Sequence, residues 1–255
     1  NAVSVPDPRF DAAGDLAQWW IISDLDDHLR QGPARPDHVM GVGGATRTLL
    51  AHTVFGHGVT TSFTSALDLG TGCGVVAMYL ARGGVPKVTA TDISERALTF
   101  ARANAYLNGL SEYIDFRAGD LFSPLAGERF SLIVSNPPFV ITPRISASDD
   151  GATTAEGQPG RYEYRDGGMT GDALAQKVVC EAPQYLADEG TLIMLANWET
   201  PWGGDGLTRV RGWIADAEEA CGDALDAWVI ERVRIDTAQY AETWARDGGA
   251  RLGDP

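Results

Sequence analysis

The sequence predicts an α/β protein with a mostly parallel sheet and helices on both faces. Apolar segments typical of strands alternate along the chain with segments of helical periodicity, which favours parallel strands joined by right-handed crossovers. The segment 191–196 is mostly apolar, as expected of a strand covered on both sides. The chain has 255 residues, 44% of them hydrophobic and 22% charged, which is ordinary for a globular protein of this size.

Each element of this fold has a local signal. Strands are predicted over 66–70, 87–92, 113–117, 132–135, 191–196 and 227–233. Helices are predicted over 46–54, 75–82, 94–107, 172–187 and 207–220, and a short amphipathic helix over 18–29. Glycine pairs or Asn-Gly steps end two of these helices. We expect residues 1–40 to form an N-terminal extension, 41–240 the main domain and 241–255 a polar tail.

Composition bears on location and partners. No apolar run approaches the roughly 18 residues of a membrane helix, and no signal peptide is visible. Cys73, Cys180 and Cys221 are odd in number and far apart, so we expect neither a disulfide framework nor a metal site, and a cytoplasmic location. The chain starts at Asn1 rather than Met, which indicates a fragment or a processed chain. The net charge of −15 argues against unaided binding to duplex DNA.

A glycine turn follows the first strand of the main domain. Asp68-Leu69-Gly70-Thr71-Gly72-Cys73-Gly74 lies between the strand and a helix, where open α/β sheets bind ligands. Glycines let the backbone approach a ligand closely. The spacing is G-x-G-x-G, not the G-x-G-x-x-G of dinucleotide sites, and so favours a nucleoside without a pyrophosphate.

Acidic residues follow the next two strands. Asp92 ends the second strand, where its carboxylate can accept both hydroxyls of a ribose. Asp120 follows the third strand and can accept from an adenine amino group, with Leu121 packed on the ring. Each aspartate alone could be a helix cap or a turn residue. Three acids after three successive strands, with Asp68 the first, make a ligand site the better interpretation.

This pattern resembles the class I S-adenosylmethionine-dependent methyltransferases over roughly residues 41–235. The resemblance implies a Rossmann-like sheet of seven strands, the last antiparallel, whereas six strands can be read here. It also implies S-adenosylmethionine as cofactor. Asp68, Gly70, Thr71, Gly72 and Gly74 would line its methionine part. Asp92, with Ile93 beside it, would hold the ribose, and Asp120 with Leu121 the adenine.

A rigid corner follows the fourth strand. Asn136-Pro137-Pro138-Phe139 has two prolines that fix the backbone and keep Asn136 out of the helical region. It resembles the Asn-Pro-Pro-aromatic motif of methyltransferases that act on planar amide or amino nitrogens. Asn136 and the Pro137 carbonyl would accept the two hydrogens of the nitrogen, and Phe139 would stack on the substrate. The plain alternative is a chain break with Phe139 in the core.

Several acceptors compete: a glutamine side chain in a protein, an amino group of an RNA or DNA base, and a small molecule. Tyr164-Arg165-Asp166-Gly167-Gly168 resembles a segment of the release-factor glutamine methyltransferases, although that family usually has Tyr where this chain has Phe139. Ribosomal-RNA guanine methyltransferases commonly carry Asn-Pro-Pro-Phe followed by His, where Val140 stands here. The acidic net charge of the chain and the Asp-Gly-Gly segment favour a protein glutamine as the methyl acceptor. The alternative to an enzyme is a non-catalytic subunit that binds the cofactor.

Two further segments have open interpretations. Residues 40–46, Met-Gly-Val-Gly-Gly-Ala-Thr, could close over the methionine end of the cofactor, or could form a loop in which Thr46 caps the following helix. Residues 142–171 form a long irregular insertion, and such loops are usually functional or disordered. The four histidines form no ligand pattern, and Cys73 fits a small buried side chain better than a nucleophile.

Overall fold

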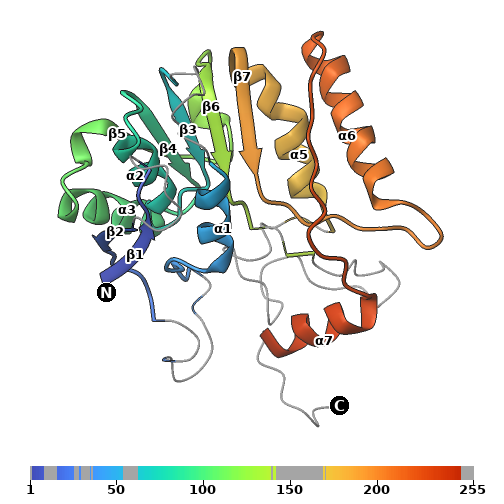
Figure 1. Cartoon of the computed structure of the whole chain (residues 1–255), viewed down its shortest axis with the longest axis horizontal. Coiled ribbons are helices and arrows are strands. Elements are labelled where there is room, and N and C mark those ends of the chain that lie inside the picture. The colour runs from blue at the N-terminus through green and yellow to red at the C-terminus, as the bar shows by residue number, and fades with distance from the viewer. Residues whose placement is uncertain are drawn as a thin grey trace, which may run out of the picture.

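A computed structural model describes residues 2–8, 16–25, 29, 35, 37–53, 63–138, 140–141, 169 and 171–247, with the backbone alone for Pro6 and 243–247 (Figure 1). The descriptions below concern these residues. Phe139, the Asp-Gly-Gly segment at 166–168 and nearly all of the 142–171 insertion lie outside them.

A five-stranded parallel sheet forms the centre of the molecule, with strand order β5-β4-β3-β6-β7 (Figure 1). Its strands are β3 (Ala66–Leu69), β4 (Val88–Asp92), β5 (Ile114–Ala118), β6 (Phe130–Ser135) and β7 (Leu186–Met194). Every pairing in this sheet is parallel. The expectation of a mostly parallel sheet is therefore confirmed.

Helices cover both faces of the sheet, as the sequence predicts. Helices α2 (Val75–Arg82) and α3 (Glu95–Leu107) pack on one face and share a core with Leu132 and Val134. Helix α5 (Ala173–Glu181) packs on the other face, where Ile133 points. The alternation along β6 shows why its sequence is apolar throughout: each successive side chain enters a different core. Helix α6 (Gly206–Cys221) packs against α5.

The N-terminal residues form a hairpin, and the predicted helix over 18–29 is wrong. Strands β1 (Ala2–Pro6) and β2 (Leu16–Trp20) pair antiparallel, and residues 21–25 continue without helix. Ala17 and Trp19 are buried while their neighbours are exposed, which is the two-residue period of a strand. Val5, Trp19 and Ile21 join the core beside α1 (Gly44–His52) and α2. The first 40 residues thus contribute to the main core.

The boundaries of the long helix before β7 also differ from the prediction. The helix predicted over 172–187 ends at Glu181 and continues as a 3₁₀ turn, η3 (Ala182–Tyr185), before β7 begins at Leu186. Pro183 lies in this turn. Proline has no N–H for an α-helical hydrogen bond and clashes with the preceding turn, so it ends the helix.

The strand predicted over 227–233 is wrong as well. In the described part of the chain, 222–236 carries neither strand nor helix between α6 and α7 (Thr237–Asp247). Trp228 is 91% exposed and Val233 72% exposed, because no neighbouring strand pairs with this segment. An apolar run alone supplies no hydrogen-bond partner for a strand. The sheet described here accordingly has five strands instead of seven, and α7 begins before the expected tail at residue 241.

Among the described helices, none combines the length and apolar character needed to cross a membrane.

Candidate active site

The predicted ligand-binding segments meet at one edge of the sheet. Leu69, at the end of β3, pairs with Thr91 of β4 and with Ser135 of β6. Asp92 pairs with Ala118 at the end of β5. The glycine turn, Asp92, the residues after Ala118 and the Asn136 corner therefore start side by side.

The glycine turn is held to the neighbouring strand by its own backbone. The N–H groups of Gly70 and Thr71 both donate to the Thr91 carbonyl oxygen, at 3.0 and 2.8 Å. The Gly72 N–H donates to Asp92 Oδ2 at 2.8 Å. These bonds fix the path of the turn across the end of β4.

The three glycines of the turn have two different roles. All have positive φ angles: +77° at Gly70, +54° at Gly72 and +86° at Gly74. A Cβ at Gly70 or Gly72 would meet no atom within 4 Å, whereas a Cβ at Gly74 would lie 2.9 Å from the Ala101 Cβ on α3. Gly74 therefore permits close packing of α3, while Gly70 and Gly72 border open space that a ligand can fill.

Asp68 lies beneath the turn as a buried support. One of its carboxylate oxygens, Oδ2, accepts from Thr71 Oγ1 at 2.5 Å and from the Ala77 N–H at 2.9 Å. Burial raises the pKa of Asp68 to about 7. Asp68 and Thr71 thus join the turn to the start of α2. Direct contact of either residue with a cofactor stays a prediction.

Asp92 joins the turn to α3. Its Oδ1 accepts from the Ser94 N–H at 2.8 Å, and Oδ2 accepts from Gly72. These two bonds place the carboxylate at the end of β4 beside the glycine turn. Ile93, the next residue, is 66% exposed.

The segment after β5 holds a polar and an apolar side chain at the same edge. The side chain of Asp120 is 62% exposed, and its Oδ2 lies 3.6 Å from Lys177 Nζ on α5. Leu121 has a φ of +45°, a left-handed conformation that is uncommon for a leucine. Its side chain packs on the core beneath α5. Asp120 is thus mostly exposed, whereas Leu121 is partly buried.

The Asn136 corner adjoins the glycine turn. Ser135 Oγ donates to the Leu69 carbonyl oxygen at 2.9 Å, which joins the ends of β6 and β3. Asn136 Nδ2 lies 3.5 Å from Thr46 Oγ1 on α1. Asn136 Oδ1 is buried and has no hydrogen-bond partner among the described residues. A buried acceptor without a partner is costly and therefore uncommon, so this oxygen is a candidate to accept from a group beyond the described residues.

Thr46 has a position that the sequence did not indicate. The interpretation of Thr46 as a helix cap is wrong, because Gly43 is the N-cap of α1 and no side chain caps this helix. Thr46 instead lies in the first turn of α1, facing Asn136. The two residues are 90 positions apart in the chain, so no local pattern could have paired them.

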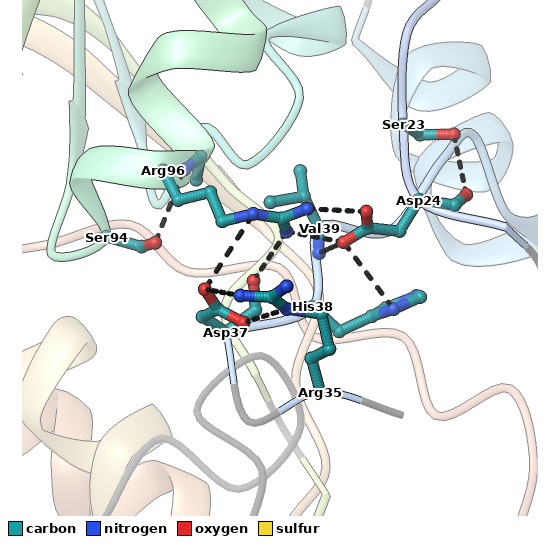
Figure 2. Close-up of polar contacts among 9 residues, drawn as sticks. Ser23, Asp24, Arg35, Asp37, His38, Val39, Ser94 and Arg96 are labelled. Carbon is teal, nitrogen blue, oxygen red and sulfur yellow. Dashed lines mark hydrogen bonds and ion pairs between the residues drawn. The ribbon is translucent and has the colours of Figure 1, made fainter. Parts of the chain in front are cut away.

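An ion-pair network ties the segment before α1 to the edge of the site. Figure 2 shows Arg96, near the start of α3, between Asp24 and Asp37. Its Nη1 and Nη2 donate to the two Asp24 carboxylate oxygens at 2.5 and 2.6 Å, and Nη1 also donates to the Asp37 carbonyl oxygen at 2.9 Å. The hydrogen bonds from Arg96 lower the pKa of Asp24 to about 2. The network begins two residues after Ser94 and thus adjoins Asp92.

Other polar groups of the described residues suggest no separate chemistry. Burial raises the pKa of the Cys73 thiol to about 12, so this cysteine is a small buried side chain, as the sequence indicates. No group of three or more His, Cys, Asp or Glu side chains within the described ranges could hold a metal ion.

The described sheet and helices form a Rossmann-like α/β fold, with the predicted ligand-binding segments at the carboxyl ends of its strands. Residues 43–148 match the family model described as the methyltransferase small domain.

Curated relatives extend the comparison. The chain is 32% identical over 183 residues to the release factor glutamine methyltransferase of Gloeobacter violaceus, covering 71% of this chain and 59% of that protein. It is 36% identical over 135 residues to the ribosomal protein uL3 glutamine methyltransferase of Bradyrhizobium diazoefficiens, covering 52% and 40%. It is 32% identical over 148 residues to the ribosomal RNA small subunit methyltransferase C of Alcanivorax borkumensis, covering 57% and 37%. The chain therefore spans between about two fifths and three fifths of these relatives.

Proposed function

We propose that this protein is an S-adenosylmethionine-dependent N-methyltransferase that acts on the side-chain amide of a protein glutamine. The observation that carries the proposal is the buried, unpartnered Asn136 Oδ1 beside the glycine turn. This oxygen needs a hydrogen-bond donor, and an amide NH₂ group supplies one.

The residues at the sheet edge fit the cofactor. The open space at Gly70 and Gly72 can receive the methionine part, and Asp92, a carboxylate at the end of β4 bonded to Gly72, suits a ribose diol. Ile93 offers exposed apolar surface, the remaining exposed part of Leu121 a smaller one, and Asp120 a carboxylate, for the adenine. These assignments are part of the proposal.

When bound, the cofactor supplies a methyl group on a sulfonium: the nitrogen lone pair forms the N–C bond as the S–C bond breaks, and the sulfonium becomes a neutral thioether. An amide nitrogen is a weak nucleophile because its lone pair is delocalised. Asn136 Oδ1 and the Pro137 carbonyl would accept its two hydrogens, orient it and stabilise the positive charge that develops. One proton then leaves the nitrogen for water. Phe139, which follows the corner, would stack on the flat substrate group.

Relatives and charge favour a protein as the acceptor. Two of the relatives above are named as glutamine methyltransferases, one for a release factor and one for a ribosomal protein. The net charge of −15 disfavours a nucleic-acid partner bound without help. A protein of the translation machinery is therefore the proposed partner, which would place this enzyme in the cytoplasm.

A base amino group of RNA is the second candidate. The similarity to the ribosomal RNA methyltransferase favours it, since an exocyclic amine presents the same planar NH₂ to Asn136. DNA is a further acceptor with the same amino chemistry.

Two measurements test the proposal. S-adenosylhomocysteine should raise the melting temperature, because it binds the folded state alone. Labelled methyl groups from S-adenosylmethionine should then appear in a protein fraction containing release factors and ribosomal proteins, and in glutamine after digestion. Label in RNA would select the second candidate. A melting shift without transfer to protein, RNA or DNA would favour a non-catalytic cofactor-binding subunit.

The variant Asn136→Ala tests the role of the corner. It should abolish transfer while keeping most of the melting shift with S-adenosylhomocysteine. A fully active variant would refute the proposed role of the Asn136 oxygen.

A further inference from the structure

We infer that Thr46 is a positioning residue that orients the Asn136 amide for methyl transfer, an inference that rests on the proposed function. Thr46 Oγ1 lies 3.5 Å from Asn136 Nδ2, and Asn136 Oδ1 is left buried and unpartnered. The contact engages the nitrogen end of the amide. The oxygen end is thereby the one left for the substrate.

The orientation of this amide decides whether the site works. An asparagine amide has an acceptor at one end and two donors at the other. With Oδ1 toward the substrate, the amide accepts a hydrogen from the nitrogen to be methylated. In the reversed orientation it would present N–H groups to another NH₂ group, and two donors cannot bond each other. The Thr46 hydroxyl can accept from Nδ2 or donate to Oδ1, so it holds one end of the amide in place, and the NH₂ group of the substrate then selects the orientation with Oδ1 toward it.

Helix α1 is anchored well enough to carry such a residue. Leu49 and Leu50, on the same helix, are fully buried in the main core. Arg47 Nη1 donates to the Ser4 carbonyl oxygen of β1 at 2.5 Å. Since the helix is tied to both the core and the hairpin, Thr46 presents its hydroxyl from a rigid element.

A purely local role for Thr46 lacks support. The N-cap position belongs to Gly43, whose backbone is extended, and the first helical backbone bond runs from the Arg47 N–H to the Gly43 carbonyl oxygen at 3.1 Å. No side chain supplies a cap bond. The contact that the structure shows for the Thr46 hydroxyl is instead the one with Asn136.

The test compares Thr46→Val with Thr46→Ser in the labelled-methyl assay, on the acceptor that the wild-type enzyme methylates. Thr46→Val keeps the shape but removes the hydroxyl, so kcat should fall roughly five- to tenfold, the effect of one lost hydrogen bond. The KM for S-adenosylmethionine and the melting temperature should stay near the wild-type values. Thr46→Ser should restore at least half of kcat. Thr46→Ala should lose as much activity as Thr46→Val, so the test does not depend on one variant.

Two controls separate positioning from a general effect on the helix. Thr48→Val removes a hydroxyl from the same helix that contacts Arg232 at 3.2 Å, and kcat should not change. In an Asn136→Asp background both ends of the side chain accept, so orientation matters less and Thr46→Val should change the residual kcat by less than twofold.

Some results would overturn the inference. They are a wild-type kcat in Thr46→Val, an equal loss in Thr48→Val, or an undiminished effect in the Asn136→Asp background. An inactive wild-type enzyme would instead count against the proposed function itself.

Discussion

Asn104 on α3 holds both backbone polar groups of Ile22, the second residue after β2. Its Oδ1 accepts from the Ile22 N–H at 2.7 Å, and its Nδ2 donates to the Ile22 carbonyl oxygen at 2.9 Å. The same Nδ2 donates to the Cys73 carbonyl oxygen in the glycine turn at 2.9 Å. One fully buried side chain thus joins the N-terminal segment to the turn.

We predict that Asn104→Leu destabilises the protein by about 2–4 kcal/mol, because it leaves the buried Cys73 carbonyl and the two part-buried backbone groups of Ile22 without this partner. Urea unfolding measures the change. Asn108→Ala is the matched control: Asn108 bonds the N–H and carbonyl oxygen of Trp20 in the same way, but at a partly exposed position, and the loss there should be about 1 kcal/mol. Equal losses at the two positions would contradict this account.

The glycine turn offers a matched pair of variants. Gly70 and Gly127 both have a φ of +77° and open space at the Cβ position, but Gly127 lies between η2 (Ser123–Leu125) and β6, outside the site. Alanine should cost each about 1–2 kcal/mol of stability through backbone strain. Gly70→Ala should also abolish the melting shift with S-adenosylhomocysteine, while Gly127→Ala keeps it. A preserved shift in Gly70→Ala would refute a ligand at that place.

Asp68 predicts a pH dependence of stability. Its pKa is raised from 3.8 to about 7, so between these values the folded state binds a proton that the unfolded state does not. This contribution is complete below pH 4 and is lost as the pH rises through 7. Asp68→Asn should remove it, so that the variant gains on the order of 2 kcal/mol relative to wild type between pH 5 and pH 8. Urea unfolding at these two pH values checks the sign, and parallel curves would refute it.

The Asp24–Arg96 pair predicts the opposite dependence. The pKa of Asp24 is lowered from 3.8 to about 2, so its stabilising effect is present above pH 4 and is lost as the pH falls through 2. Asp24→Asn should cost about 1–2 kcal/mol at pH 7, and the difference from wild type should disappear near pH 2. A loss that is independent of pH would show that the ion pair is not its cause.

The sequence is a good guide to the sheet edge and a poor guide to the chain on either side of it. Gly70, Asp92 and Asn136 could be brought together in advance, because the carboxyl ends of parallel strands share one edge. The helix predicted over 18–29 is wrong because the apolar residues of this segment fit a helix as well as a strand. Pairing with β1 makes its first residues a strand. The strand predicted over 227–233 is wrong because this segment, despite its strand-like pattern, has no partner strand in the described chain. The contact between Thr46 and Asn136 was out of reach, because the two residues are 90 positions apart and meet only on folding.

The shared edge has a consequence for how substrate choice can change. Under the proposed function, a corner that accepts two hydrogens from a flat NH₂ group would serve a glutamine and a nucleobase equally well, so the groups that act on the nitrogen would not distinguish the macromolecules that carry it. Selectivity must then come from the flanking segments, which can be exchanged while the strands beneath stay unaltered. Exchanging such segments between protein-modifying and RNA-modifying relatives is therefore the direct way to change the methyl acceptor of the proposed enzyme.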